Sequence, residues 1–220
     1  MIRHPVKRQK EMFEKMARGG KRGKYNLKAR AERYQQTRQR IVETAVELHK
    51  IHGPAQTTIT DIAKKAGVQR QTVYNHFPDE LSLFKACSAH NRALNPPPEP
   101  EPWKLIPDPE ERLRKALAEV YAYYRRNEQM IANVTRDAQA NPNVRKVLEP
   151  RVKHQERMRD ALAAGWEQQR DGQLCHKLLY GALWMALEFQ TWHTLVRQQA
   201  FDDDESIELV VGMVRCLMQG

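Results

Sequence analysis

The stretch TTITDIAKKAGVQRQTVYNHF constrains the fold more than any other part of this chain. Thr58 and Asp61 stand at the spacing of a helix-capping box, and an apolar stripe with helical spacing follows them. Gly67 comes directly after that stripe, and glycine adopts the positive φ that a tight turn requires. A second short helical pattern follows the turn. The stretch therefore predicts two short helices joined by a tight turn, which is a helix-turn-helix.

The second of these helices is expected to turn a polar face outward. Val73 and Phe77 are four residues apart, so both point to the inner side of a helix. The side chains left outside can donate hydrogen bonds to base edges and accept them, and acids are absent among them: Arg70, Gln71, Thr72, Tyr74, Asn75 and His76.

Helical periodicity dominates the rest of the chain, and no run of residues alternates as a strand would. The stretch NPPPEPEPW cannot continue a helix and divides the chain in two. We expect an all-α protein, with an N-terminal three-helix helix-turn-helix DNA-binding domain followed by a helical domain for ligand binding and dimerisation. The expected segments are a basic extension (1–33), the helix-turn-helix domain (34–94), a Pro-rich linker (95–107) and the second helical domain (108–220).

The positive charge of the chain is concentrated at its N-terminus. The net charge is +10, and the first 40 residues hold 14 Lys and Arg against three acids. Such asymmetry indicates a polyanionic partner. Three scattered cysteines argue against a disulfide framework, and no apolar run is long enough to span a membrane. We therefore expect a soluble cytoplasmic protein without a membrane partner.

The run from Arg38 to Phe77 resembles the DNA-binding domain of the TetR family of bacterial transcriptional regulators. The matching pieces are Ile41 and Ala45, the segment TTITDIAKKAGV and the segment TVYNHF. The resemblance implies an all-α homodimer whose N-terminal domain binds operator DNA. It also implies a C-terminal domain that holds a small-molecule effector and dimerises through its last two helices.

The resemblance carries DNA contacts to matching positions of this chain. Base-edge contacts are expected from Arg70, Gln71, Tyr74 and Asn75, because these residue types can read guanine, adenine or the thymine methyl. Phosphate contacts are expected from Thr37, Arg38, Thr58, Thr72 and His76. Glu80 departs from the pattern, since the family usually has a phosphate-binding Lys there. Affinity for the DNA backbone must then come from elsewhere.

The basic extension is a candidate source of that affinity. We expect the first domain helix to begin near Asn26, which leaves RGGKRGKY as a flexible basic segment. Small glycines and basic side chains suit a minor groove, so Arg18, Lys21, Arg22 and Lys24 are candidate minor-groove contacts. Two other interpretations stay open: a disordered phosphate-binding tail, and a membrane or processing role.

Two further sets of residues are assigned to the second domain. Aromatic, flexible or unexpectedly polar side chains on its helices are expected to line a ligand pocket: Tyr121, Tyr124, Met158, Leu162, Trp166, Trp184, Glu188 and Trp192. Small residues that allow close helix approach, and apolar residues of the last helix, are expected at a dimer interface: Gly181, Ala182, Val210, Val211, Val214, Leu217 and Met218.

Catalysis is the competing class of function. The chain has no G-x-S-x-G, H-E-x-x-H, Walker or Rossmann motif. His49 and His52 lack a third metal ligand nearby, so we expect neither an enzyme nor a cofactor or metal site. We expect a ligand-responsive repressor that binds a pseudo-palindromic operator as a dimer. The alternatives are an effector-independent architectural DNA-binding protein and a transcriptional activator of the same fold.

Overall fold

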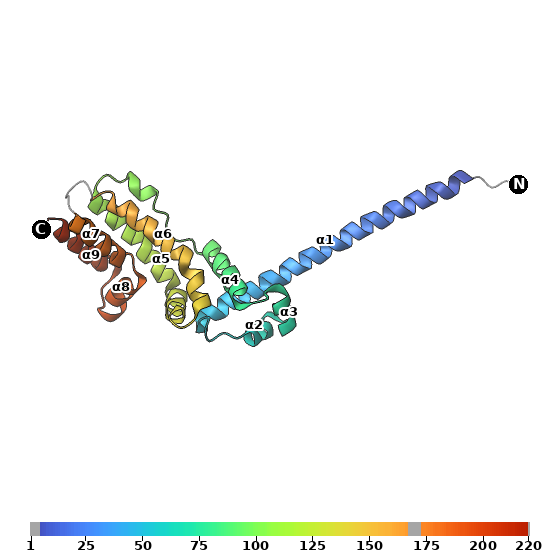
Figure 1. Cartoon of the computed structure of the whole chain (residues 1–220), viewed down its shortest axis with the longest axis horizontal. Helices are drawn as coiled ribbons and strands as arrows, with labels where there is room; N and C mark the ends of the chain where they lie inside the picture. Colours follow the sequence, from blue (N-terminus) through green and yellow to red (C-terminus); the bar gives the residue numbers. More distant parts are fainter. Residues whose placement is uncertain (1–4, 167–172, 220) are drawn as a thin grey trace.

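The computed structural model describes the backbone of residues 5–166 and 173–219, and within these ranges the side chains from Leu27 onward. Every regular element in these ranges is helical, which confirms the all-α prediction of a helix-turn-helix followed by a helical domain (Figure 1). The elements are α1 (Pro5–His52), α2 (Ile59–Ala66), α3 (Arg70–His76), α4 (Glu80–Leu94), η1 (Pro102–Leu105), α5 (Pro109–Ala138), α6 (Pro142–Ala163), α7 (Gln173–Ala186), α8 (Phe189–His193), the π-helical η2 (Thr194–Gln198) and α9 (Asp203–Gln219).

The first compact unit consists of α2, α3, α4 and the C-terminal part of α1, and is called the N-terminal unit below. Its core gathers inward-facing apolar residues of all four helices, among them Ile41 of α1, Ile62 of α2, Val73 of α3 and Leu83 of α4. Each of these four side chains is at most 1% exposed, so the unit has a hydrophobic core of its own.

The second compact unit, the C-terminal unit, contains α5 to α9 and η1. Side-chain caps begin its two long helices: Asp108 accepts a hydrogen bond from the amide of Glu111, and Asn141 caps α6 in the same way. In both helices a proline occupies the first turn, where its missing N–H costs nothing. The core of this unit is separate from that of the N-terminal unit and lies between α5, α6, α7 and α9.

The Pro-rich linker is fastened to the C-terminal unit. Trp103 is fully buried, and its Nε1 donates a hydrogen bond of 2.8 Å to Glu119. Arg157 of α6 pairs with both Glu99 and Glu101. The linker is therefore a fixed wall beside α6.

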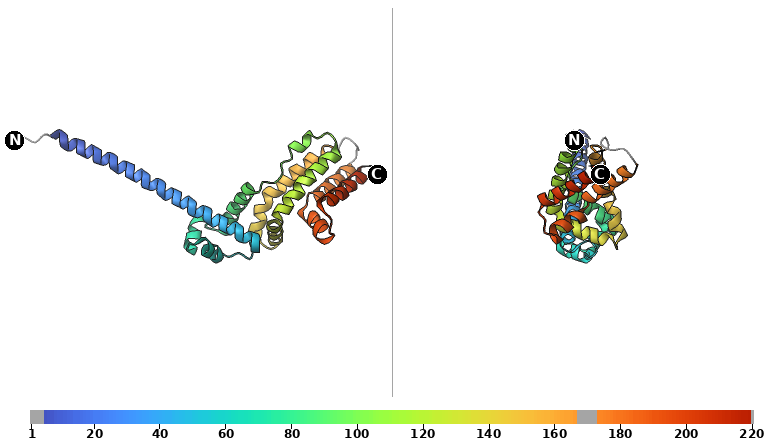
Figure 2. Two further views of the ribbon diagram at one scale, coloured as in Figure 1. Left: turned by 180° about the vertical axis from the view of Figure 1, so that it is seen from behind. Right: turned by 90° about the vertical axis from the view of Figure 1, so that its left-hand side faces the viewer.

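The prediction that the first helix begins near Asn26 is wrong, because α1 begins at Pro5 and runs for 48 residues. The glycines of RGGKRGKY each cost about 1 kcal/mol relative to alanine in a helix, but they cause no clash. The Lys, Arg, Glu, Met and Ala around them favour a helix, and proline suits its first position. Figures 1 and 2 show α1 as one rod that leads away from the N-terminal unit.

In the ranges that the structure describes, none of the helices is both long enough and apolar enough to cross a bilayer.

Candidate nucleic-acid interface and interdomain cavity

The turn between α2 and α3 has the geometry that the sequence predicts. The Thr58 hydroxyl accepts a hydrogen bond of 3.1 Å from the amide of Asp61, and the Asp61 carboxylate accepts one from the amide of Thr58. The Thr58 hydroxyl and, second, the Thr58 amide donate hydrogen bonds to the Asp61 carboxylate and hold its pKa below the usual value. Gly67 ends α2 with φ 67° and ψ 39°, and the next amide, that of Val68, donates to Ala63. The left-handed conformation of Gly67 sets the angle at which α3 leaves the turn.

Helix α3 presents a polar outer face above a buried inner one. Val73 and Phe77 are at most 2% exposed, whereas the four residues expected to read bases are all exposed. Those four are Arg70, Gln71, Tyr74 and Asn75. The side-chain amide of Gln71 donates a hydrogen bond of 3.1 Å to the side-chain oxygen Oδ1 of Asn75, which orders the two as a pair. Each amide keeps a free donor or acceptor, so the pair can still address a base edge.

Several of the expected phosphate contacts lie where α1 meets α3. The guanidinium of Arg38 lies 4.7 Å from the centre of the Phe77 ring, and the rings of Tyr34 and His76 are 4.1 Å apart. Burial, and secondarily the charge of Arg38, lower the pKa of His76. Both effects favour the neutral form of His76, which can still donate a hydrogen bond to a phosphate.

The two threonines beside this group differ from Thr58 in what they can offer. Thr37 and Thr72 are half-buried at the edge of the same surface. The hydroxyl of Thr58 instead donates a hydrogen bond of 2.6 Å to Asp61, so its proton is already engaged in the cap. If the Thr58 hydroxyl donated to a phosphate instead, its hydrogen bond to Asp61 would be lost.

The four candidate arm residues share one helix. Arg18, Lys21, Arg22 and Lys24 lie on the backbone of α1, and their side chains lie outside the described residues. An α-helix with side chains is about 10–12 Å wide, whereas the minor groove is only about 6 Å wide. A helix of this width does not fit into a minor groove, so entry there would require it to unwind.

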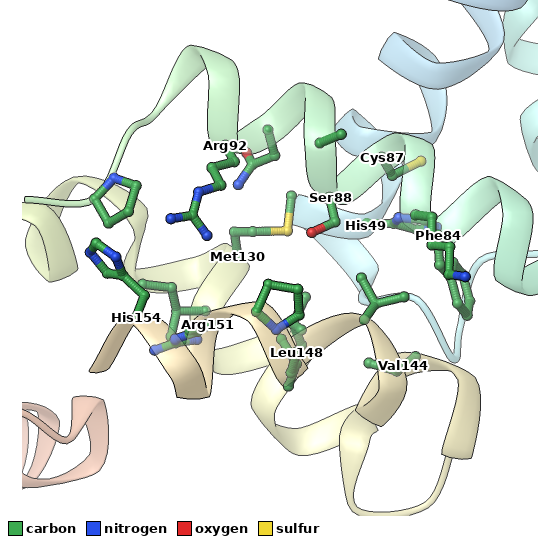
Figure 3. A pocket seen from close by; sticks show the side chains of 18 of the residues that line it. His49, Phe84, Cys87, Ser88, Arg92, Met130, Val144, Leu148, Arg151 and His154 are labelled. Carbon is green, nitrogen blue, oxygen red and sulfur yellow. The ribbon is translucent and has the colours of Figure 1, made fainter. Parts of the chain in front are cut away.

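A cavity of about 500 Å³ lies between the two units (Figure 3). Its walls come from α1 and α4 of the N-terminal unit, from α5 and α6 of the C-terminal unit, and from the linker prolines. Of the residues expected to line a pocket, Tyr124 and Met158 do so. Tyr121, Leu162, Trp166 and Trp192 lie in the core of the C-terminal unit instead.

The last two expected pocket residues lie near the break between α7 and α8. Trp184 and Glu188 are half-buried, and the guanidinium of Arg159 lies 5.8 Å from the Trp184 ring centre. Glu188 immediately precedes α8, in the short break that separates α8 from α7. The tryptophans and Glu188 therefore do not surround the cavity that the structure contains.

Sequence reasoning missed the charged residues of this cavity. Arg92 comes from α4, whereas Arg151 and His154 come from α6. Each stands among other polar residues of its helix, and only the packing of α4 on α6 brings the three together. No spacing along the chain could have indicated this group.

Polar contacts fasten the two units together next to the cavity. Asn133 of α5 donates to the carbonyl oxygen of Lys50, and Arg136 donates to that of His52, so α5 caps the end of α1. Glu80, the first residue of α4, accepts a hydrogen bond of 3.0 Å from Asn143. The Glu80 carboxylate therefore links the N-terminal unit to the C-terminal unit. The family resemblance alone indicates only that a phosphate contact is lost at this position.

Most of the residues expected at a dimer interface are buried within the chain's own core. The buried ones are residues of α9: Val210, Val211, Val214 and Met218. Leu217 and Ala182 are half-buried, and Gly181 is exposed. The apolar side chains that α7 and α9 leave in solvent are Leu174, Leu178, Met185, Leu209 and Met213. A stripe of apolar residues cannot by itself distinguish a buried face from an exposed one, and α9 has apolar residues on both.

Residues 41–87 match the family described as "Bacterial regulatory proteins, tetR family". The chain is 42% identical over 55 residues to the HTH-type transcriptional regulator SrpR of Pseudomonas putida, and the aligned stretch covers 25% of this chain and 26% of SrpR. It is 44% identical over 50 residues to the HTH-type transcriptional regulator AcrR of Shigella flexneri, and this alignment covers 23% of each chain. The matches thus span about a quarter of these curated relatives.

The likeness of the fold extends further than the likeness of the sequence. A tetR-family transcriptional regulator from Streptomyces coelicolor superposes with a TM-score of 0.58 over 84% of this chain and 81% of its own, at 16% identity. This likeness shows the fold of both units, and the sequence match is confined to the first. The N-terminal unit of this chain is a helix-turn-helix domain of the TetR family.

Proposed function

We propose that this protein is a transcriptional regulator that binds operator DNA as a homodimer and leaves it when a small molecule enters the interdomain cavity. The observation that carries the proposal is the outer face of α3. It presents Arg70, Gln71, Tyr74 and Asn75 to solvent on a helix that is rigidly fixed by the Gly67 turn and by its own core. Such a face can enter a major groove and distinguish base pairs.

The exposed apolar residues of α7 and α9 support a dimer. Leu174, Leu178 and Met185 follow one another at helical spacing along one side of α7, and Leu209 and Met213 do so on α9. Gly181 lies in the middle of the α7 set, and a Cβ added there would meet nothing within 4 Å. A second copy of these two helices could approach closely at that point. A dimer would place two α3 helices on one DNA, as a pseudo-palindromic operator requires.

The position of the cavity supports regulation by an effector. Its walls belong to both units, and α4 both lines the cavity and packs in the core that holds α2 and α3. A ligand that fits one arrangement of α4 on α6 better than another would shift the spacing of the two α3 helices. If that arrangement does not match the operator, ligand and DNA bind in competition, and the protein acts as a repressor that the ligand releases.

The test of DNA reading is an affinity measurement on a site that the protein itself selects from genomic fragments. Arg70→Ala and Asn75→Ala should each lower the affinity for this site by about 1–3 kcal/mol, which is roughly ten- to hundredfold. Arg126→Ala, which removes an exposed Arg of α5, is the matched control and should leave the affinity unchanged. Equal binding to all sequences, with no effect of Arg70→Ala, would contradict the proposal and indicate an architectural protein.

A further inference from the structure

The charges around the interdomain cavity all have one sign. The side chains of Lys85, Arg92, Lys146 and Arg151 line it, together with His49 and His154. Among the described residues in its wall, none is Asp or Glu. A cationic ligand would meet only like charges there, whereas an anion would meet only opposite ones.

Three of the basic groups lie at one end of the cavity. Figure 3 shows Arg92, Arg151 and His154 at this end. Arg92 is exposed at the rim, and Arg151 is half-buried below it. Arginines that converge from two helices suit a carboxylate or a phosphate, because each guanidinium offers parallel N–H donors.

Two buried side chains at α6 have polar atoms that need a partner. His154 is 4% exposed, and its Nε2 lies 2.8 Å from the Pro98 carbonyl oxygen. A carbonyl only accepts, so Nε2 carries the proton, and the other ring nitrogen, Nδ1, has no partner within the described chain. Gln155 is 7% exposed, and its Nε2 is a donor without a partner among the described atoms. Buried polar atoms are rarely left unpaired, so these two point to a polar ligand.

The remainder of the cavity is mostly apolar. Phe84 and Val144 lie toward the end opposite Arg92 in Figure 3, and Met130 and Leu148 lie between the two ends. The volume of about 500 Å³ falls within the usual range of small-molecule sites. The wall thus combines a basic end with a hydrophobic body.

We propose that the cavity binds an amphipathic anion, with a carboxylate or phosphate held by Arg92 and Arg151 and an apolar body against Met130 and Leu148. The inference rests on the proposed function, in which this cavity is the effector site, and it names the chemical class of that effector. Arg92 belongs to α4, whereas Arg151 belongs to α6. The anion therefore bridges the two units and fixes the position of α4 relative to α6.

Isothermal titration calorimetry on the full-length protein tests the charge preference. The probes are decanoate, decyl phosphate, decanamide and decyltrimethylammonium, which differ in the head group and share one alkyl chain length. Both anions, or one of them, should bind at least tenfold more tightly than the amide and the ammonium compound. The stronger of the two anions identifies the head group as a carboxylate or a phosphate. Equal or tighter binding of the amide or the ammonium compound overturns the inference.

Substitutions locate the preference within the cavity. R92Q and R151Q should each lower the affinity for the preferred anion at least tenfold and leave that for decanamide unchanged, which also shows that the variant is folded. If R151Q loses decanamide binding, the test is made with R92Q alone, because Arg92 lies at the exposed rim and its substitution disturbs the fold less. R126Q on the outer face of α5 is the control and should bind every probe as the unchanged protein does. Anion binding that survives both R92Q and R151Q overturns the inference.

A second readout separates this inference from the proposed function. The complex of the protein with fluorescently labelled operator DNA is titrated with the preferred anion, and release of the DNA is followed by fluorescence anisotropy. If the anion binds in the cavity and the DNA stays bound, the ligand class stands and the proposed regulation fails. If a neutral compound releases the DNA and neither anion binds, the regulation stands and the ligand class fails.

Discussion

The carboxylate of Asp137, near the end of α5, accepts a hydrogen bond of 2.8 Å from the backbone amide of Ala55, in the loop that follows α1. Asp137 is only 5% exposed, and its other oxygen lies 2.8 Å from Nε of Arg136. Arg136 in turn donates to the carbonyl oxygen of His52. A single buried acid thus ties the end of α5 to the chain segment between α1 and α2.

Removal of this acid should weaken both stability and communication between the units. Asp137→Ala leaves the Ala55 amide unpaired, which should lower the free energy of unfolding by about 1–3 kcal/mol in a urea titration. The same variant should still bind operator DNA but respond more weakly to ligand. Asp160→Ala is the control, because Asp160 is half-exposed and pairs with its neighbour Arg159; it should cost less than about 1 kcal/mol. Equal losses for the two variants would contradict this role.

His49 should make the stability of the protein depend on pH. The side chain is 4% exposed, and burial lowers its pKa from 6.5 to about 4, partly opposed by the charge of Asp137. Because the folded pKa lies below the unfolded one, the contribution of neutral His49 is complete above pH 6.5. It is lost as the pH falls from 6.5 toward 4, and the loss amounts to about 3 kcal/mol.

Unfolding free energies of His49→Gln and of the unchanged protein, measured between pH 7 and pH 4, isolate this contribution. The variant should lose less stability over this interval, because glutamine does not titrate. His52→Gln removes an exposed histidine three residues away and should follow the unchanged protein. Parallel curves for His49→Gln and the unchanged protein would show that His49 is not buried in its neutral form.

Two glycines with positive φ should respond very differently to alanine. Gly67 has φ 67°, and a Cβ there would meet nothing within 4 Å, so Gly67→Ala costs only the backbone strain of about 1–2 kcal/mol. Gly53 has φ 91°, and a Cβ there would collide with the side chains of Arg136 and Asp137. Gly53→Ala should therefore be the more damaging change by thermal unfolding, and should separate the ends of α1 and α5. A smaller loss at Gly53 than at Gly67 would contradict this view of the junction.

The exposed face of α7 and α9 should determine the oligomeric state. Leu178→Glu or Met213→Glu places a charge on that face, and each should convert a dimer to monomers in sedimentation experiments and weaken operator binding. Leu105→Glu is the matched control, since Leu105 is 83% exposed in η1 and belongs to neither helix. Dimers that survive both substitutions would place the interface elsewhere.

The sequence was sufficient for the helix-turn-helix because its signals are local. The Thr58–Asp61 cap, the Gly67 turn and the inward pair of α3 each depend on residues within a few positions of one another. The observed φ of Gly67 and the burial of Val73 match the expectation from the sequence. Such short-range features can be derived without knowing how distant helices pack.

The cavity and the face of α9 could not be derived in this way. The cavity exists because α4 packs on α6, which brings Arg92 and Arg151, far apart in the sequence, into the wall of one cavity. In α9, both Val211 and Met213 are apolar, and only the completed core shows that the first is buried and the second is exposed. Aromatic residues such as Trp192 were assigned to a pocket because size and burial look alike in a core and in a ligand wall.

The N-terminal half of α1 should contribute affinity for DNA through charge. A protein that starts at Lys24 lacks eight of the Lys and Arg residues that give the first 40 residues their positive charge. Each phosphate that these residues neutralise adds about 0.9 to the slope of log affinity against log salt concentration. The truncated protein should therefore bind its operator more than tenfold more weakly at low salt, with a slope that is flatter by several units.

Footprinting of the same two proteins distinguishes how the segment binds. If it remains helical, phosphates outside the α3 contacts should be protected while the flanking minor grooves stay reactive, because a helix is wider than the minor groove. Loss of minor-groove protection on truncation would instead show that RGGKRGKY unwinds on DNA into the flexible arm expected from its glycines. An unchanged affinity and slope would leave the reading of DNA to α3 alone, and Glu80 would then have no compensating charge in this segment.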